Sequence, residues 1–235
     1  MMRLFNYILK LLFNKANKYL ISVILLVVMI SCTQPLILKY MSVDESGYFM
    51  YGKKSQRIFF EEVFISDSFE KIWQRETKGS QSHSSIVVYK DFLFTADLAG
   101  RIYAYNKDSG KEIGYENNNG AISTSPVINK LRLFYVLNNH KEKYSTLIMF
   151  DFVNGKKLNE VRIDGGVNNE LLPTQNALFV LSDNGELIKF NYAGEKESGI
   201  NTKVRTRCIP ASDENIIVWG NQKGELYIVS LSNGE

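Results

Sequence analysis

The chain has 235 residues, of which 45% are hydrophobic and 23% charged, with 16 Gly and 4 Pro. This composition excludes collagen-like, low-complexity and wholly disordered classes of protein. The net charge of +3 does not indicate a nucleic-acid-binding protein, because the excess lies at one end of the chain. Residues 1–31 hold four basic and no acidic side chains, which leaves 24 basic and 25 acidic residues, a net charge of −1, in the rest.

The first 31 residues have the pattern of a secretory signal. Residues 1–19 are basic and partly apolar, residues 20–30 are apolar except for Ser22, and Cys32 follows shortly afterwards. The apolar run is shorter than the roughly 20 residues that a helix needs to cross a bilayer. We expect an N-terminal signal helix over 1–31, and an uncleaved anchor that also uses residues 33–38 is the alternative.

From Phe69 onward, short runs of β-branched and aromatic residues alternate with turns rich in Asn, Asp and Gly. Such alternation, without a helical period, predicts strands. Four copies of one unit follow, each with a first strand that usually contains Pro, an apolar second strand, a hairpin turn, a third strand and a turn that closes on glycine. The closing glycines, 45, 39 and 40 residues apart, are Gly110, Gly155, Gly194 and Gly234.

The units set the expected strands and the expected fold. The first strands are expected at 85–88, 125–128, 172–174 and 209–211. The second strands are expected at 92–95, 133–136, 178–181 and 216–219. The third strands are expected at 101–105, 147–150, 187–190 and 226–229. A period of about 40 residues with four strands per unit is typical of a β-propeller blade. The sequence therefore predicts an all-β fold, a β-propeller of four-stranded antiparallel blades over 69–235, after a linker at 32–68 whose residues 48–65 could hold a strand or two.

Candidate sites for chemistry are sparse in this pattern. Asp183–Glu186 could begin a calcium loop, but it lacks the further acidic positions and is expected to form a hairpin turn. Asp164–Gly166 lacks the strand-to-helix context of a phosphate-binding loop, so a plain loop is expected. Three cations, Lys203, Arg205 and Arg207, alternate along an expected strand and would face either an acidic partner or solvent.

Cysteine and histidine give no sign of a metal site. The two cysteines are Cys32 and Cys208, and no CxxC or His-rich cluster is present. Cys208 is expected to be a small buried hydrophobe. His83 and His140 lie in polar contexts without a motif around them. We expect no catalytic, cofactor-binding or metal-binding residues.

The tetrapeptide Met29-Ile30-Ser31-Cys32 resembles a bacterial lipobox, although that family usually has Leu where Met29 stands. The resemblance implies that residues 1–31 are a lipoprotein signal peptide and that Cys32 is lipidated. Thr33 after the cysteine implies the periplasmic face of the outer membrane, and inner-membrane anchoring in the periplasm is the alternative. A chance cysteine after a transmembrane anchor would explain the same residues.

The segment Ala99–Ile113 resembles the PQQ-like propeller repeat, and residues 184–194 and 223–234 match that repeat more loosely. The order of lipobox, linker, Lys71-Ile72-Trp73 and repeats resembles the BamB family of outer-membrane assembly lipoproteins. By that resemblance about four of eight blades are present, and an expected Phe69–Arg75 strand would complete a last blade that the sequence lacks. We expect a truncated copy, a partial propeller that closes no ring by itself and exposes two sheet faces; a dimer of two four-repeat halves is the alternative.

The resemblance implies a non-catalytic periplasmic scaffold lipoprotein. It would assist assembly and insertion of β-barrel proteins through contacts with the central barrel-inserting subunit of the outer-membrane assembly machine, and would bind no nucleic acid. The closing Trp of the repeat is present only at Trp73, with Gly114, Asn159 and Ser198 at the equivalent positions. The vicinal cysteines and calcium-ligating carboxylates of quinoprotein enzymes are not found. A fragment of a periplasmic PQQ-dependent dehydrogenase and a ligand-sensing propeller domain are the alternatives.

Overall fold

The computed structural model describes residues 34–43, 47–58, 68–82, 86–139, 141, 143–213 and 215–231. The expected signal helix, Cys32, His83 and His140 lie outside these residues. The chain divides into two units, 1–34 and 35–235, and the fold described below is that of the second unit. The described residues form strands, turns and bends but no helix, and thus no helix that could cross a membrane.

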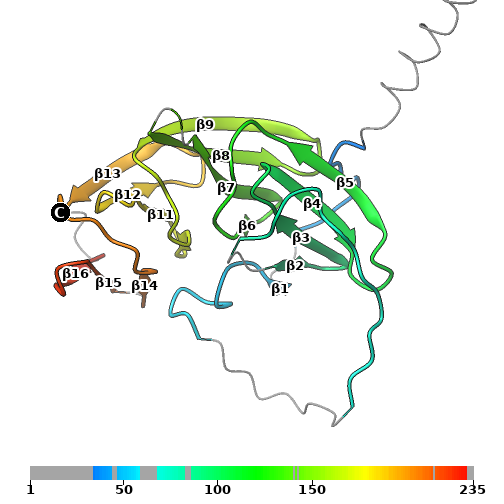
Figure 1. The fold of residues 1–235 in the computed structure, drawn as a ribbon, viewed down its shortest axis with the longest axis horizontal. Helices are drawn as coiled ribbons and strands as arrows, with labels where there is room; N and C mark the ends of the chain where they lie inside the picture. Colours follow the sequence, from blue (N-terminus) through cyan, green and yellow to red (C-terminus); the bar gives the residue numbers. More distant parts are fainter. Residues whose placement is uncertain are drawn as a thin grey trace, which may run out of the picture. The chain divides into compact units, whose positions relative to one another are not determined.

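In the described residues, sixteen strands form four antiparallel sheets that follow one another along the chain (Figure 1). The first sheet contains β1 (Gly47–Tyr48), β2 (Val87–Tyr89), β3 (Phe92–Ala96), β4 (Arg101–Asn106) and β5 (Glu112–Asn117). The second contains β6 (Val127–Asn129), β7 (Arg132–Asn139), β8 (Tyr144–Asp151) and β9 (Lys156–Asp164). The third contains β10 (Leu172–Pro173), β11 (Leu178–Leu181), β12 (Glu186–Phe190) and β13 (Lys196–Asn201). The fourth contains β14 (Ala211–Ser212), β15 (Ile216–Gly220) and β16 (Leu226–Ser230).

The repeat read from the sequence is confirmed as this succession of sheets. Each expected first, second and third strand overlaps a strand of the structure, and a fourth strand follows the closing glycine in the first three sheets. The second hairpin is longer than expected, because its ladder continues beyond the expected strands at 133–136 and 147–150 through the pairs Asn138–Ser145 and Asn139–Tyr144. Gly110 adopts a φ of +64°, a conformation that glycine reaches without the steric penalty of a side chain.

Most of the hydrophobic core lies between consecutive sheets. Strand β11 shows why its apolar run does not alternate with polar residues: all four of its side chains are buried. Leu178 and Val180 pack in the cluster shared with the second sheet, whereas Phe179 and Leu181 pack in the cluster shared with the fourth. A strand covered on both faces needs apolar residues at every position.

The stretch expected to be a linker contacts all four sheets. We call residues 35–58 the N-terminal arm; its described parts are 35–43 and 47–58. Leu36 and Leu38 are 0% and 3% exposed and belong to the core cluster between the first and second sheets. The Leu38 amide donates to the carbonyl of Phe152 at 2.7 Å. Burial of both leucines stabilises the fold by about 1.5–3 kcal/mol each.

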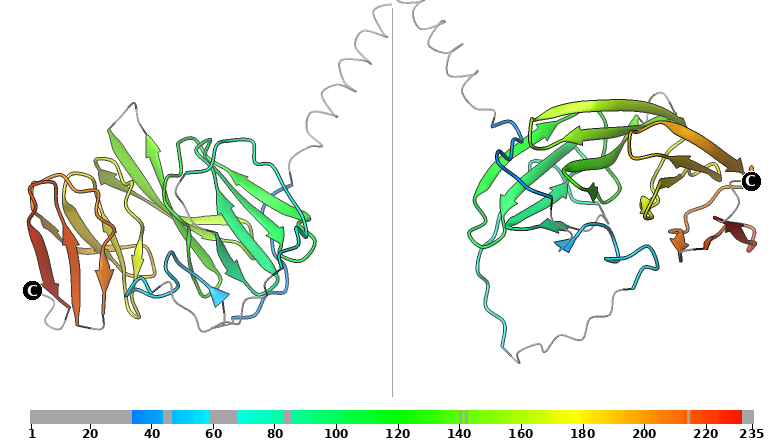
Figure 2. Two further views of the ribbon diagram at one scale, coloured as in Figure 1. Left: turned by 60° about the horizontal axis from the view of Figure 1, so that its bottom comes forward. Right: turned by 180° about the vertical axis from the view of Figure 1, so that it is seen from behind.

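Beyond β1, the arm passes along the first strands of the later sheets (Figure 2). The Ile128 amide in β6 donates to the carbonyl of Phe49 at 2.9 Å, and the Ser212 amide in β14 donates to the carbonyl of Ser55 at 3.0 Å. Arg57 donates to carbonyls next to the third and fourth sheets. The boundary expected at residue 68 stays a prediction, but the arm is packed structure where it is described.

Residues 68–82, the covering segment, lie against the face of the first sheet that points away from the second. The Gly79 amide donates to Oδ2 of Asp97 at 2.9 Å, and the Lys78 amide donates to the hydroxyl of Tyr103 at 3.1 Å. Tyr103 and Tyr105 are only 2% and 3% exposed as a result. Burial raises the pKa of Tyr105 to about 12. The expectation of two exposed sheet faces is therefore wrong for the outer face of the first sheet.

Phe69–Arg75 forms no β-ladder with any described residue, and its expected pairing in a last blade stays a prediction; Trp73 Nε1 donates to the carbonyl of Lys107 at 2.8 Å. One further expectation is corrected. Residues 202–210 connect β13 to β14 without forming a strand, so Lys203, Arg205 and Arg207 do not lie on one.

Cys208 is exposed rather than buried. In the irregular segment that contains Cys208, the buried side chains are those of Thr206, which is 1% exposed, and Pro210. Thr206 donates its hydroxyl to the carbonyl of Gly220 at 2.6 Å, which places the neighbouring side chains outward.

Candidate functional site

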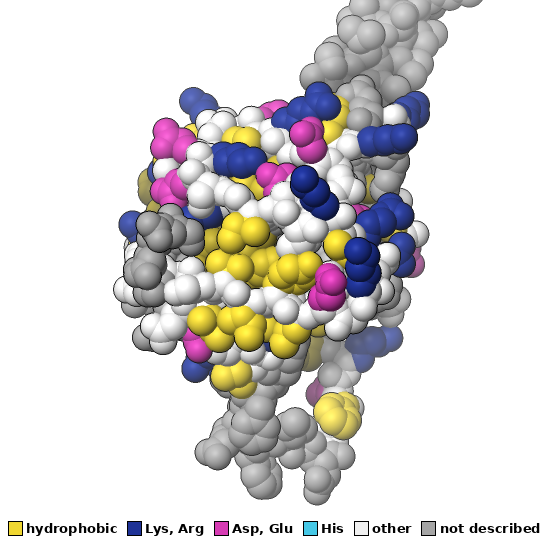
Figure 3. Space-filling model, turned by 90° about the vertical axis from the view of Figure 1, so that its left-hand side faces the viewer, with side chains coloured by type: hydrophobic (Ala, Val, Ile, Leu, Met, Phe, Trp, Pro, Cys, Tyr) yellow, Lys and Arg dark blue, Asp and Glu magenta, His cyan; other side chains and the backbone are white. Residues whose placement is uncertain are grey.

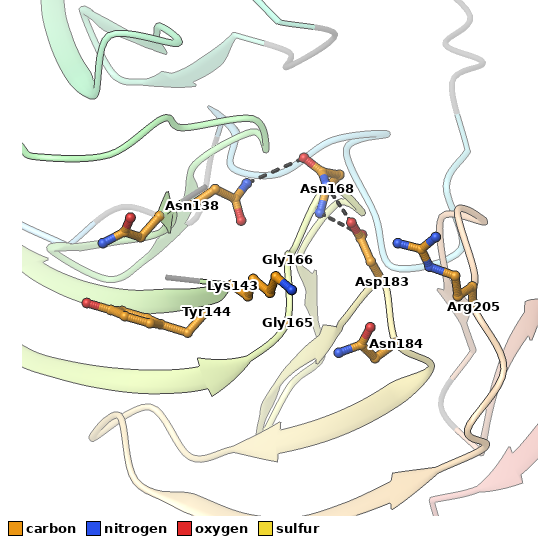
Figure 4. Close-up of a pocket in the computed structure, with 10 residues that line it drawn as sticks. Asn138, Lys143, Tyr144, Gly165, Gly166, Asn168, Asp183, Asn184 and Arg205 are labelled. Carbon is orange, nitrogen blue, oxygen red and sulfur yellow. Dashed lines mark hydrogen bonds between the residues drawn. The ribbon is translucent and has the colours of Figure 1, made fainter. Parts of the chain in front are cut away.

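A polar pocket of about 400 Å³ opens at one end of the second and third sheets (Figure 4). It is formed where the β7–β8 hairpin, the loop after β9, the β11–β12 turn and the segment before β14 meet. The lining residues are Asn138, Asn139, Lys143, Tyr144, Gly165, Gly166, Asn168, Asp183, Asn184 and Arg205.

Asn138 is the buried anchor of this pocket, with 3% of its surface exposed. Its Nδ2 donates to the carbonyl of Val167 at 2.9 Å and to Oγ of Ser123 at 2.9 Å. Its Oδ1 accepts from the Val167 amide at 2.9 Å and from Oγ of Ser145 at 2.6 Å. With the side-chain amide satisfied on both atoms, Asn138 fixes the loop that follows β9.

Asp183 anchors the opposite wall from the β11–β12 turn. Its Oδ2 accepts from Nδ2 of Asn168 at 2.6 Å, and its Oδ1 accepts from the Asn168 amide at 3.2 Å. Hydrogen bonds to a carboxylate are shorter and stronger than those between neutral groups. The carbonyl of Asp183 accepts from the Thr206 amide at 3.2 Å, so this turn also holds the segment that carries Arg205.

The charge of the lining is unequal. Lys143 and Arg205 lie on either side of Asp183 in the view of Figure 4, and the Asp183 carboxylate is already held by Asn168. Two cations and several amide groups thus face a cavity that has one engaged carboxylate. Such a site suits a carboxylate or main-chain carbonyls of a partner. The ten lining residues include no His, Cys or Ser, and hence no Ser–His or Cys–His pair.

A second polar cluster lies where the arm meets the third and fourth sheets. Arg57 donates from Nη2 to the carbonyl of Leu171 at 2.9 Å, from Nε to that of Pro210 at 3.1 Å and from Nη1 to that of Tyr51 at 2.6 Å. Nearby Glu170 is 5% exposed and accepts from the Ser125 amide at 2.7 Å. Burial raises the pKa of Glu170, and the Ser125 hydrogen bonds and the charge of Arg57 oppose that rise.

The sequence of the row of sheets matches one family over most of its length. The family model described as "Outer membrane protein assembly factor BamB" matches residues 67–235. The chain belongs to the BamB family. A search of curated proteins finds no match.

Solved structures agree with the BamB-family fold. The crystal structure of BamB from Moraxella catarrhalis superposes with a TM-score of 0.56 at 17% identity, covering 68% of this chain and 52% of that one. The chain thus spans about half the length of that BamB. The computationally designed Ika4 protein superposes at 0.53 and 12% identity, covering 68% of this chain and 99% of Ika4. A europium-containing methanol dehydrogenase superposes at 0.55 and 10% identity, covering 64% and 40%. At these identities the likeness shows a shared PQQ-like propeller fold alone.

Three segments that were weighed separately in the sequence meet in the pocket of this BamB-family chain. Asp183–Glu186 is the hairpin turn that was expected, and Asp164–Gly166 ends β9 and enters a loop. Arg205 is one of the three alternating cations noted in the sequence. The sequence analysis did not identify Asn138 and Asn168 as pocket residues. Their hydrogen bonds in the pocket join residues far apart in sequence, and no local motif predicts such contacts. Among the described residues, no group of three or more His, Cys, Asp or Glu could hold a metal ion. Cys32 lies outside the described residues.

Proposed function

We propose that the chain is a non-catalytic scaffold of the outer-membrane protein assembly machinery, acting in the periplasm through protein–protein contacts. The observation that carries this proposal is the family match over residues 67–235. The polar pocket supports it, because two cations and several amides that line it suit recognition of a polar segment of a partner. The proposed partner is the central barrel-inserting subunit, and the proposed anchor to the outer membrane is a lipid on Cys32.

The contact with the partner is proposed to use the pocket rim. Lys143 and Arg205 are exposed on two different elements that the Asn138 and Asp183 hydrogen bonds hold in place. A pair of cations on one rim favours an acidic segment of the partner and speeds its encounter.

Co-purification from membranes tests this contact. The full-length tagged chain should recover the barrel-inserting subunit, and the double variant Lys143→Glu/Arg205→Glu should recover at least about tenfold less, since like charges at a docking site repel. Lys156→Glu is the matched control, because Lys156 is an exposed cation outside the pocket lining. Equal recovery by all three chains would contradict the pocket assignment, and recovery of no assembly subunit by the unchanged chain would contradict the function.

The lipid anchor has its own test. Cys32→Ala should abolish labelling of the chain by a radioactive or clickable fatty acid and should move it out of the membrane fraction after mild washing. Cys208→Ala is the control, because Cys208 is the exposed cysteine of the folded part. Undiminished labelling of the Cys32→Ala chain would contradict lipidation at this residue.

A further inference from the structure

Three asparagine–glycine pairs lie in the described part of the chain, each in a turn or connection between strands. They are Asn119-Gly120 between β5 and β6, Asn154-Gly155 between β8 and β9, and Asn184-Gly185 between β11 and β12. Asparagine is thermolabile in proteins, and a glycine after it leaves the next amide nitrogen unshielded because glycine has no Cβ. All three pairs have the same local chemistry, so the structure around each one decides its reactivity.

The pair in the β11–β12 turn is held at its glycine. The Gly185 amide donates to the carbonyl of Ser182 at 3.0 Å, and the Gly185 carbonyl accepts from the Thr202 amide at 3.0 Å. The amide nitrogen of Gly185 is therefore engaged. Its hydrogen bond must break before this nitrogen can turn toward the side chain of Asn184.

The pair in the β8–β9 turn is held at its asparagine. Nδ2 of Asn154 donates to Oδ2 of Asp151 at 2.7 Å, and the Asn154 main-chain amide donates to Oδ1 of Asp151 at 3.0 Å. A hydrogen bond to a carboxylate is stronger than one between neutral groups. The side-chain amide of Asn154 is therefore fixed in its orientation.

The pair between β5 and β6 is held at neither residue. Asn119 is exposed, and neither its side chain nor the Gly120 amide forms a hydrogen bond with another described residue. The residue before the pair is firmly placed, because Asn118 donates from its main-chain amide and from Nδ2 to the carbonyl of Gly100, at 2.9 and 3.1 Å. Among the three pairs, this one meets the least resistance to ring closure.

We propose that Asn119 is a site of self-modification by deamidation through a cyclic imide with Gly120. The Gly120 nitrogen attacks Cγ of Asn119, so that an N–Cγ bond forms and the Cγ–Nδ2 bond breaks. The leaving nitrogen takes up the proton that the Gly120 nitrogen gives up, and departs as ammonia. Water then opens the ring: opening at Cγ gives aspartate, and opening at the main-chain carbonyl carbon gives isoaspartate, whose main chain is longer by one carbon.

The longer main chain affects the polar pocket. The connection is held on both sides of the pair, so the added carbon must be accommodated at Asn119 and Gly120. On the far side, Ala121 and Asn138 form a bridge in which the amide of each donates to the carbonyl of the other, at 3.1 and 2.8 Å. Asn138 is also the buried anchor of the pocket. Isoaspartate at position 119 should loosen this bridge, whereas aspartate there only adds a charge.

Mass spectrometry of the folded chain tests the site. The full chain is incubated in detergent, because hydrophobic side chains gather on one side of the molecule (Figure 3) and favour association. Peptide mapping should find that Asn119 converts at least about threefold faster than Asn154 or Asn184, since a hydrogen bond that must first break slows a step by roughly 2- to 12-fold. Asn119→Gln should remove the signal, which distinguishes Asn119 from the two asparagines before it.

Incubation in urea is the matched control. Unfolding removes the hydrogen bonds that protect the other two pairs, so the three asparagines should then convert at similar rates. Conversion of Asn119 no faster than that of Asn154 and Asn184 in the folded chain would overturn the proposal. An equally large preference for Asn119 in urea would also overturn it, because the preference would then come from the local sequence and not from the structure.

Thermal unfolding tests the effect on the bridge. The isoaspartate form, separated by ion exchange, should unfold about 2–4 °C below the Asn119→Asp chain, the shift expected when roughly one hydrogen bond is lost from a chain of this size. Asn119→Asp carries the same added charge on a main chain of ordinary length, so the comparison isolates the added carbon. Equal unfolding temperatures would overturn the proposed link between position 119 and the pocket.

Discussion

Arg57 offers the most direct test of whether the N-terminal arm holds the row of sheets together. Its guanidinium donates to the carbonyls of Leu171 and Pro210, which precede the third and fourth sheets, and to that of Tyr51 within the arm. Hydrogen bonds that involve a charged group contribute about 1.5–3 kcal/mol each, less where water can replace them. Because the side chain is half-buried, Arg57→Met should lower the free energy of unfolding by about 2–5 kcal/mol.

Two companion variants separate the hydrogen bonds from other effects. Arg57→Lys keeps the positive charge but offers a single ammonium group, so it should lose roughly half as much stability. Both variants retain the φ of +57° at this residue, so backbone strain cancels between them. Arg207→Met is the control for removal of an exposed arginine and should change stability by less than about 0.5 kcal/mol.

The two tryptophans make the assay position-specific. Trp219 stacks on Tyr227 in the fourth sheet at 5.3 Å between ring centroids, and Trp73 lies 6.4 Å from Tyr105 at the first. Urea unfolding of the full chain in detergent, followed by fluorescence in Trp73→Phe and Trp219→Phe backgrounds, therefore reports the two ends separately. Arg57→Met should shift the Trp219 transition more than the Trp73 transition. If Arg57→Met and Arg207→Met unfold at the same urea concentration, the arm does not hold the sheets as argued.

Three further outcomes are expected. Gly110→Ala should lower the free energy of unfolding by about 2–4 kcal/mol, and Gly224→Ala by about 1 kcal/mol. Both glycines have positive φ, but of the two only Gly110 has a neighbour, the side chain of Trp73, that an added Cβ would clash with. Equal losses of stability in thermal unfolding would exclude the clash. Glu170→Gln should flatten the pH dependence of stability. Because the pKa of Glu170 is raised in the folded chain, the folded chain holds a proton that the unfolded chain releases, so stability falls as the pH rises from the ordinary glutamate pKa. Unchanged urea midpoints of the unmodified chain from acidic to neutral pH would contradict this. Cys208 should react with a maleimide in the folded state at nearly the rate seen in denaturant, because its side chain is exposed, and strong protection would contradict that exposure.

The repeat was predictable because it is a local property of the sequence. Turn glycines such as Gly110 and Gly194, together with β-branched and aromatic runs, mark each hairpin within about ten residues. Register within the hairpins follows from the same positions. The sheet order needed nothing beyond chain order, since neighbouring strands in the described sheets are consecutive strands of the chain.

The arm and the site could not be read in this way. Leu36 and Leu38 sit in an apolar stretch without period or motif, and only their contacts with residues about 115 positions later, such as Phe152, show that they belong to the core. Cys208 was misjudged because an average tendency of cysteine to be buried decides little in an irregular segment. The pocket depends on Asn138 and Asp183 meeting loops from other sheets, and long-range partners leave no trace in a local pattern.

The early start of the arm would limit the distance between the sheets and the membrane if Cys32 carries the proposed lipid. Pro35 already forms a bridge with Tyr115 of β5, and only Thr33 and Gln34 separate it from Cys32. A fully extended chain advances about 3.3–3.6 Å per residue, so these three steps reach roughly 11 Å. With the proposed lipid on Cys32, the bridge at Tyr115 of β5 would be held within roughly 11 Å of the lipid-bearing cysteine. Such a short tether would keep the sheets at the membrane surface in a restricted set of orientations, and partners would have to be reached from there.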